Sequence, residues 1–247
     1  MLNILKSEFY KTNKSFLPII YIFLPLCYAI LMYLAYLTTS LNRFSLKQIV
    51  RLYIVLLSSA LPLVISLITS KVVEMEKEAG HFHLILSECN SRLKAYLAKF
   101  IFLILNTAFS LFLAIFIFAI LFRRQNIYDW TIETLLIFVG CLPLHLIHLW
   151  INFKFGKGAS IVLSFLQTLL SIILLTNLGD KIWYYFPSTW STRLSITYLT
   201  LKGENIRNTV FNAELIKWSL YGIPLIVFIL AFSLLWFCFW EPIANNE

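Results

Sequence analysis

The chain of 247 residues lacks the sequence features of a protein that hydrolyses nucleotides by itself. No G-x-x-x-x-G-K-[ST] motif occurs, and only seven glycines are available to build a phosphate-binding loop. The four cysteines also give no sign of a disulfide framework, because none falls in a predicted external loop. We therefore expect no nucleotide site, no catalytic residues and no cofactor in this chain.

Charged residues are scarce as well. They make up 13% of the chain, whereas hydrophobic residues make up 60%, and the mean hydropathy is +0.82. Six windows of at least 19 residues contain no Asp, Glu, Lys or Arg, and about 20 apolar residues suffice to cross a hydrocarbon core. A helix is required there because lipid cannot satisfy backbone N–H and C=O groups. We predict a single all-α integral membrane domain, 1–247, with six transmembrane helices at 15–42, 52–70, 100–122, 134–153, 158–179 and 218–240.

Residues 1–14 precede the first window and form an amphipathic pattern. On a helical wheel, apolar residues such as Leu2, Leu5 and Phe9 gather on one side, and the lysines gather on the other. This pattern predicts an interfacial helix whose lysines face lipid head groups. Glu8 falls within the apolar arc, which favours the alternative of a simple basic flank to the first span.

The orientation of the chain is not decided by its positive charges. With six spans both termini lie on one side, and the loops on each side hold ten of the 20 lysines and arginines. We place both termini in the cytoplasm, because five of the ten opposing cations fall in one long loop, 178–217, which we expect to be extracellular. The net charge of +8 is typical of contact with a membrane surface and forms no stripe for nucleic acid.

The six windows also lack the carboxylates and lysines that mark proton or ion relays inside membranes, which disfavours a self-powered carrier. His145 and His148 are the titratable groups at membrane depth, and their spacing places them on one helix face. With Cys141 one turn earlier they could serve a membrane-embedded enzyme. Histidines between spans also act as interhelical hydrogen-bonding groups, and we predict no metal site.

The segment 71–99, between the second and third windows, is compact and charged. The acidic run that includes Glu76 and Glu78 is interrupted by Gly80, and Asn90 and Ser91 are suitable N-caps for the next span. Between them, residues 81–88 can form two helical turns with an apolar side that contains Phe82 and Leu86. The pattern fits either a solvated linker or a short coupling helix on which a partner outside the bilayer pushes.

Aromatic residues gather in the predicted loop 178–217. The group consists of Trp183, Tyr184, Tyr185, Phe186 and Trp190. Such rings are favoured at the head-group level, so they could anchor helix ends or meet an amphiphilic peptide in the membrane. Five cations and three carboxylates leave the loop at +2, so recognition of a cationic peptide would depend on apolar contacts.

Two sets of motifs carry a resemblance to a known family. The run E-K-E-A-G, an apolar turn and then N-S-R resemble the coupling segment of type 2 ABC exporter permeases. The beginning LKSEFYKTNKSFLP, the E-x-x-x-G at Glu76 to Gly80, the Ser91-Arg92 pair, Lys99 and the long aromatic loop resemble lantibiotic-immunity permeases of the MutE, EpiE and NisE type. The likeness covers essentially the whole chain.

The resemblance implies a transporter subunit in a bacterial plasma membrane. Such permeases pair with a second six-helix permease above a cytosolic ATPase dimer that binds ATP and Mg²⁺, and they expel a lantibiotic or similar peptide from the membrane to give self-immunity. A type 2 permease for another amphiphilic drug, lipid or cytolytic peptide is the alternative. By this likeness the ATPase-coupling residues are Glu76, Glu78, Gly80, Phe82 and Leu86, and Arg92 braces the bend.

Overall fold

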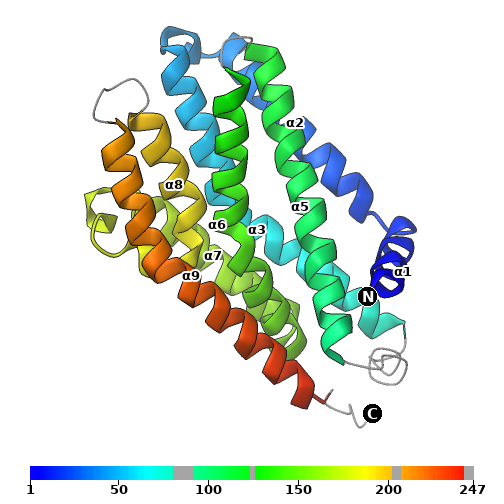
Figure 1. Ribbon diagram of the computed structural model, residues 1–247. Helices are drawn as coiled ribbons and strands as arrows, with labels where there is room; N and C mark the ends of the chain where they lie inside the picture. The colour runs from blue at the N-terminus through cyan, green and yellow to red at the C-terminus, as the bar shows by residue number, and fades with distance from the viewer. Residues whose placement is uncertain (80–91, 123–125, 202–206, 242–247) are drawn as a thin grey trace.

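The computed structural model describes residues 1–79, 92–122, 126–201 and 207–241, and within them the regular structure is entirely helical (Figure 1). The α-helices in these described ranges are α1 (Leu2–Asn13), α2 (Leu17–Thr38), α3 (Leu46–Glu78), α5 (Arg92–Phe122), α6 (Ile127–Phe155), α7 (Lys157–Ile173), α8 (Pro187–Leu201) and α9 (Arg207–Phe239). Short 3₁₀ turns lie at Ser40–Arg43 (η1), Asn177–Gly179 (η2) and Trp183–Tyr185 (η3).

Five of these helices are long and apolar enough to cross a membrane, namely α2, α3, α5, α6 and α9. In the bundle, α2 and α5 run toward one end and α3, α6 and α9 run toward the other, and α1 and the end of α9 lie in the same half of it (Figure 1). The protein is therefore an all-α, multi-pass membrane protein by length and composition. Five of the six charge-free windows coincide with these long helices.

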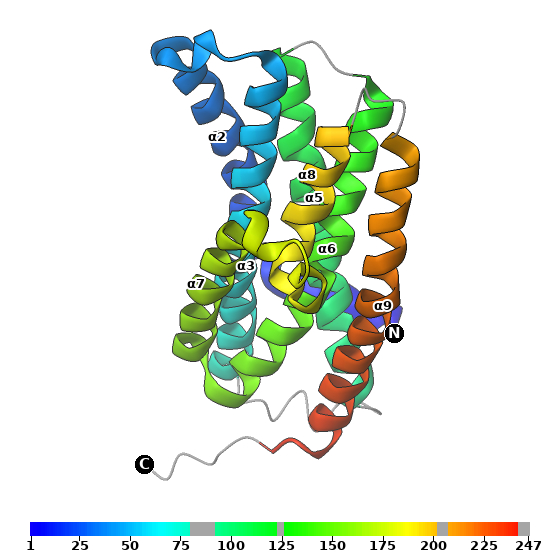
Figure 2. The same cartoon turned by 90° about the vertical axis from the view of Figure 1, so that its left-hand side faces the viewer.

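The fifth window, 158–179, does not form the single membrane-spanning helix that was predicted. Its helix, α7, ends at Ile173 after 17 residues, and α8 then continues from the interior of the bundle toward the opposite end (Figure 2). The two short helices contact each other and both pack against α3 and α6. The expectation of a long loop over 178–217 is thus wrong: residues 187–201 form a largely buried helix, and 207–217 are the first turns of α9.

The reason lies in the composition of α7 and α8. The buried residues of α7 are all polar, Ser160, Ser164, Gln167 and Ser171, while its exposed face is apolar. Most of the buried residues of α8 are serines, threonines or aromatics, so α8 has too little hydropathy to be recognised as part of a span. These helices have polar sides that face protein and not lipid.

A close approach of two backbones holds α8 in the bundle. A Cβ atom added at Gly140 in α6 would lie 2.7 Å from Ser191 Cα and 2.8 Å from Ser191 Oγ, so a glycine is needed at this crossing. Ser191 Oγ also donates a hydrogen bond of 2.9 Å to the Ile137 carbonyl of α6. Small residues allow membrane helices to pack this tightly.

Candidate functional site

The half of the bundle that holds α1 and the end of α9 carries the candidate site (Figure 1). There α3 ends at Glu78 and α5 begins at Arg92, so these two helices flank the predicted coupling helix. The amphipathic helix α1 packs against α5 and α2 at this same end (Figure 1). Three elements that are distant in sequence thus meet beside the segment 80–91.

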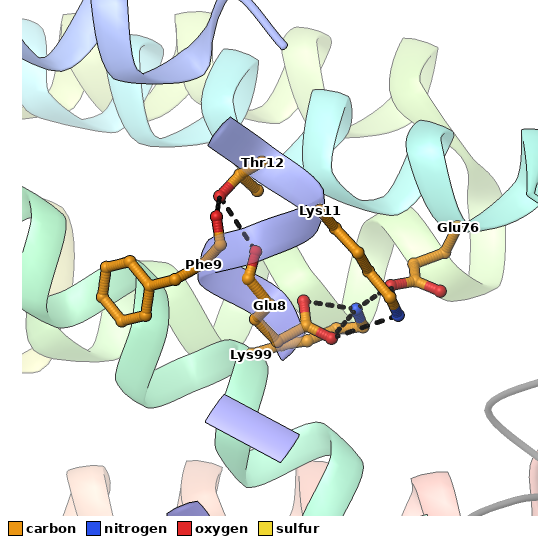
Figure 3. A network of polar contacts seen from close by, with 6 residues as sticks. All are labelled: Glu8, Phe9, Lys11, Thr12, Glu76 and Lys99. Atoms are coloured by element: carbon orange, nitrogen blue, oxygen red, sulfur yellow. Dashed lines mark hydrogen bonds and ion pairs between the residues drawn. The ribbon is translucent and has the colours of Figure 1, made fainter. Parts of the chain in front are cut away.

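A cluster of four charged residues, three of them buried, joins these elements, and we call it the charge clamp (Figure 3). Its centre is Lys99 of α5, which is only 1% exposed; its ammonium lies 2.9 and 2.8 Å from the two carboxylate oxygens of Glu8 in α1. Lys99 also donates a hydrogen bond to Oε1 of Glu76 in α3. Lys11 of α1 lies 3.0 Å from that same Glu76 oxygen and 3.7 Å from Glu8 Oε1.

The clamp is balanced in charge and shielded from solvent on its carboxylate side. Glu8 is 4% exposed and Glu76 is 5% exposed, whereas the side chain of Lys11 is 41% exposed. Burial lowers the pKa of Lys11, but the carboxylates of Glu76 and Glu8 outweigh burial and raise that pKa above its ordinary value. Two carboxylates and two ammonium groups therefore neutralise one another, which buried charges require.

The structure changes the role that we predicted for Glu76. A residue that contacts an external ATPase must be accessible, but Glu76 points into the protein and is bound by Lys99 and Lys11. Glu78, two residues later, is exposed at the end of α3 and stays available to a partner. The predicted residues Gly80, Phe82 and Leu86 lie outside the described residues.

Arg92 joins the start of α5 to the end of α9. Its Nη1 donates hydrogen bonds of 3.2 Å to the carbonyl oxygens of Cys238 and Trp240. These are among the carbonyls that lack partners at a helix C-terminus, where a cation is also favoured by the helix dipole. Arg92 thus ties the start of α5 to the end of α9, whereas the bend that it was predicted to brace lies outside the described residues.

Sequence reasoning missed Glu8 and Lys11 as members of this site. The signal was present, because Glu8 is the single carboxylate in the apolar arc of α1. A charge on the apolar face of an interfacial helix is costly unless a buried partner neutralises it, and Lys99 is that partner. A helix is present over residues 2–13 as predicted, although Leu2 and Phe9 of its apolar arc remain exposed.

A second polar group links α3, α6 and α7 farther inside the bundle. His148 Nδ1 lies 2.9 Å from Ser160 Oγ, and His148 Nε2 lies 2.9 Å from Gln167 Oε1. Ser160 in turn lies 2.8 Å from Ser66 Oγ of α3, and Asn152 accepts a hydrogen bond from Ser70 of the same helix. The polar face of α7 is thus satisfied by side chains of its neighbours.

His145 makes similar interhelical contacts and does not meet His148 in a metal site. Its Nε2 lies 2.9 Å from Thr107 Oγ1 of α5, and its Nδ1 lies 3.1 Å from the Cys141 carbonyl oxygen. Among the described residues no group of three or more His, Cys, Asp or Glu side chains is arranged to hold a metal ion. The arrangement around both histidines matches the hydrogen-bonding alternative from the sequence.

Arg193 of α8, which sequence reasoning treated only as a loop cation, closes the gap between α7 and α8. Its Nε donates a 2.6 Å hydrogen bond to the Leu174 carbonyl, its Nη2 donates one of 2.6 Å to the Thr176 carbonyl, and its Nη1 pairs with Asp180 at 2.9 Å. Leu174 is the C-terminal cap of α7, where helix carbonyls lack intrahelical partners, whereas the Thr176 carbonyl also accepts a hydrogen bond from the Gly179 N–H. The interruption between α7 and α8 can lie within the bundle because Arg193 caps the end of α7.

The aromatic group at 183–190 forms a small core and does not lie in a loop at one end of the bundle. Trp183 and Trp190 are buried; Trp190 packs edge-to-face on Trp218 of α9 with ring centroids 5.6 Å apart and donates a hydrogen bond to the Tyr184 carbonyl. Tyr184 stacks on Tyr221 of α9. Only Tyr185 and Phe186 of the group are substantially exposed, so the two tryptophans cannot meet a peptide in this conformation.

No protein-family model matches this chain, and neither the curated proteins nor the solved structures give a significant match.

Proposed function

We propose that the protein is the permease subunit of an ATP-driven exporter of the type 2 ABC class. Its main support is the charge clamp, which ties α1, α3 and α5 together beside the segment 80–91. A push on that segment would act on the end of α3 and the start of α5. Because Lys99 joins both helices to α1, the three elements would move as one body.

The hydrogen bonds of Arg92 extend this linkage to α9. Four of the helices that meet at this end are therefore connected by polar contacts, most of them shielded from solvent. A linkage of this kind suits a machine that receives force at one end of the bundle. In this proposal α7 and α8 together form a sixth crossing, both termini are cytoplasmic, and the exposed Glu78 faces the ATPase.

The energy would come from a partner chain. The sequence has no phosphate-binding motif, so ATP and Mg²⁺ would be bound by a cytosolic ATPase dimer, and a second six-helix permease would complete the complex. The chain itself would be a transporter subunit without enzymatic activity. The resemblance in sequence supports a lantibiotic or similar amphiphilic peptide as cargo, expelled from a bacterial plasma membrane to give self-immunity.

Affinity purification of the full chain from its native membrane tests the coupling proposal. We expect a polypeptide with a phosphate-binding motif to copurify, and Glu78→Lys to reduce its recovery because a reversed charge at a packed interface weakens association. Lys47→Glu is the matched control, since Lys47 is exposed on the same helix at the opposite end of the bundle. Equal recovery of the ATPase with both variants would assign the end of α3 to a passive role.

The cargo is tested separately in cells. Cells with the complete complex should retain less membrane-bound lantibiotic, and survive higher doses, than cells whose ATPase binds ATP but cannot hydrolyse it. Equal retention of peptide in the two strains would contradict export. Copurification of the ATPase combined with equal retention would favour a permease for another amphiphile.

A further inference from the structure

Two cavities lie one after the other along the pair of helices α2 and α5. The first has a volume of about 450 Å³, lies between α1, α2 and α5, and is lined by residues that include Lys6, Asn13 and Asn106. The second has a volume of about 160 Å³, lies between α2, α3 and α5, and has an almost wholly apolar lining. Tyr21 lines both cavities, so the two are adjacent.

The second cavity faces the lipid side of the bundle. Leu24 of α2 and Leu56 of α3 line it and are 46% and 44% exposed, and both belong to helices that are apolar enough to cross a membrane. In a bilayer such a hollow is in contact with hydrocarbon and not with water. Its apolar lining fits an acyl chain and gives no favourable contact to a polar group.

The combined length of the cavities matches one leaflet. On α2 their linings extend from Leu17 to Tyr28, which is about 16 Å at about 1.5 Å per residue. Half of a hydrocarbon core about 30 Å thick is about 15 Å. The polar cavity lies beside the interfacial helix α1, and the apolar cavity follows it toward the middle of the bundle.

Two polar groups in the lining have no partner among the described residues. Lys6 makes no ion pair with any carboxylate there. The Tyr21 hydroxyl is buried without a hydrogen bond, although the side chain as a whole is only 4% exposed. A buried hydroxyl without a partner is destabilising, so a hydrogen-bonding group that reaches this place would be stabilising.

We propose that the two cavities form a binding site for one anionic phospholipid from the leaflet in which α1 lies. The phosphate group would pair with Lys6 in the polar cavity, where the Tyr21 hydroxyl can donate a hydrogen bond to a head-group or ester oxygen. One acyl chain would fill the apolar cavity between α2, α3 and α5. The bound lipid would join α1 to α2 on the side of α1 that the charge clamp does not reach.

Native mass spectrometry of the purified full chain tests the site, after reconstitution with phosphatidylglycerol or with phosphatidylcholine of the same chain lengths. We expect one phosphatidylglycerol to remain bound in preference to phosphatidylcholine. Lys6→Gln should lower the affinity for phosphatidylglycerol about fivefold, because a basic residue near anionic lipid contributes about that factor. Lys14→Gln removes the same charge near the end of the same helix but lines neither cavity, so it should retain the lipid.

The acyl-chain cavity has its own pair of variants. Ala60→Phe would place a ring in this cavity and should reduce retention of both lipids, whereas Ala231→Phe puts the same ring on an exposed part of α9 and should not. Tyr21→Phe leaves the shape unchanged; it should not reduce thermal stability in lipid-free detergent but should weaken the stabilisation by phosphatidylglycerol.

Three results would overturn the proposal. Equal loss of lipid in the Lys6 and Lys14 variants would mean that only a diffuse surface charge attracts it. Normal retention by Ala60→Phe would mean that no chain enters the cavity. A lipid-free dimer that persists in both lipids would identify a second copy of the chain as the occupant. Lipid retention needs neither an ATPase nor transport, so it can fail or succeed independently of the proposed function.

Discussion

Replacing Lys99 by methionine removes the central cation of the charge clamp while it keeps an unbranched side chain of similar length. The change leaves Glu8 and Glu76 facing each other with 4% and 5% exposure and only the exposed Lys11 to neutralise them. Breaking a buried ion pair by removing one partner typically costs about 3 to 5 kcal/mol, because the remaining charge is not compensated. We expect a loss of stability in this range.

For a chain of this size, 1 kcal/mol shifts the melting temperature by about 2 to 4 °C, so Lys99→Met should lower it by about 6 to 20 °C. Thermal unfolding of the purified protein in one detergent measures the shift. Lys71→Met is the matched control, since Lys71 forms an exposed pair with Glu74 at 3.2 Å on α3. Exposed pairs contribute about 0 to 1 kcal/mol, and the control should melt close to the original protein.

A triple variant separates charge from packing. Lys99→Met combined with Glu8→Gln and Glu76→Gln removes all the charges that Lys99 compensated, so most of the lost stability should return. Lys11 would then turn its ammonium toward solvent, which its exposed position allows. If the triple variant melts as low as Lys99→Met, or if Lys99→Met melts like the Lys71 control, electrostatic pairing is not what holds α1 in place.

Three further outcomes follow from the contacts described above. Arg193→Ala removes two hydrogen bonds that the guanidinium donates just after α7, so thermal unfolding should show a loss of stability of about 3 kcal/mol or more. Arg43→Ala, at an exposed position, is the control. If Arg193→Ala loses no more stability than Arg43→Ala, the interruption between α7 and α8 needs no cap. Gly140→Ala should lower the stability by about 1 to 3 kcal/mol, because the added methyl group forces α6 away from α8. Gly158→Ala meets no neighbouring atom and should be neutral or stabilising. Equal melting temperatures of the two variants would refute the close crossing. The pKa of Lys11 is raised above 10.5, so its contribution, measured as the melting difference from Lys11→Met, should be constant up to that pH and decline only above it. A difference that already shrinks at neutral pH would contradict this assignment.

The long helices could be predicted from the sequence for a local reason. A run of about 20 residues without charge has to satisfy its backbone internally in lipid, and a helix does so without help from distant residues. The windows therefore coincide with α2, α3, α5, α6 and α9. The helix α1 follows from its own amphipathic pattern in the same way.

The charge clamp could be predicted only in part. The sequence marks Glu8 as a misplaced carboxylate and Lys99 as a cation at the start of a span, but they are 91 residues apart. Nothing local joins them, and the same is true of Glu76 and Lys11. The sequence analysis placed Glu76 with its acidic neighbours as a residue that contacts the ATPase, but the structure buries it. Whether one carboxylate of such a run is buried depends on which helix packs over it.

The sequence by itself determined that this is a helical membrane protein with an amphipathic beginning and a charged segment between its second and third apolar stretches. Only the tertiary structure decided where polar residues are buried: the broken crossing of α7 and α8, the cap formed by Arg193, and the aromatic core at Trp190. The physical reason is that a polar stretch can lie at membrane depth only if other helices supply its hydrogen bonds and cover its polar face. Those partners come from α3, α6 and α9, and they cannot be identified from the hydropathy along the chain.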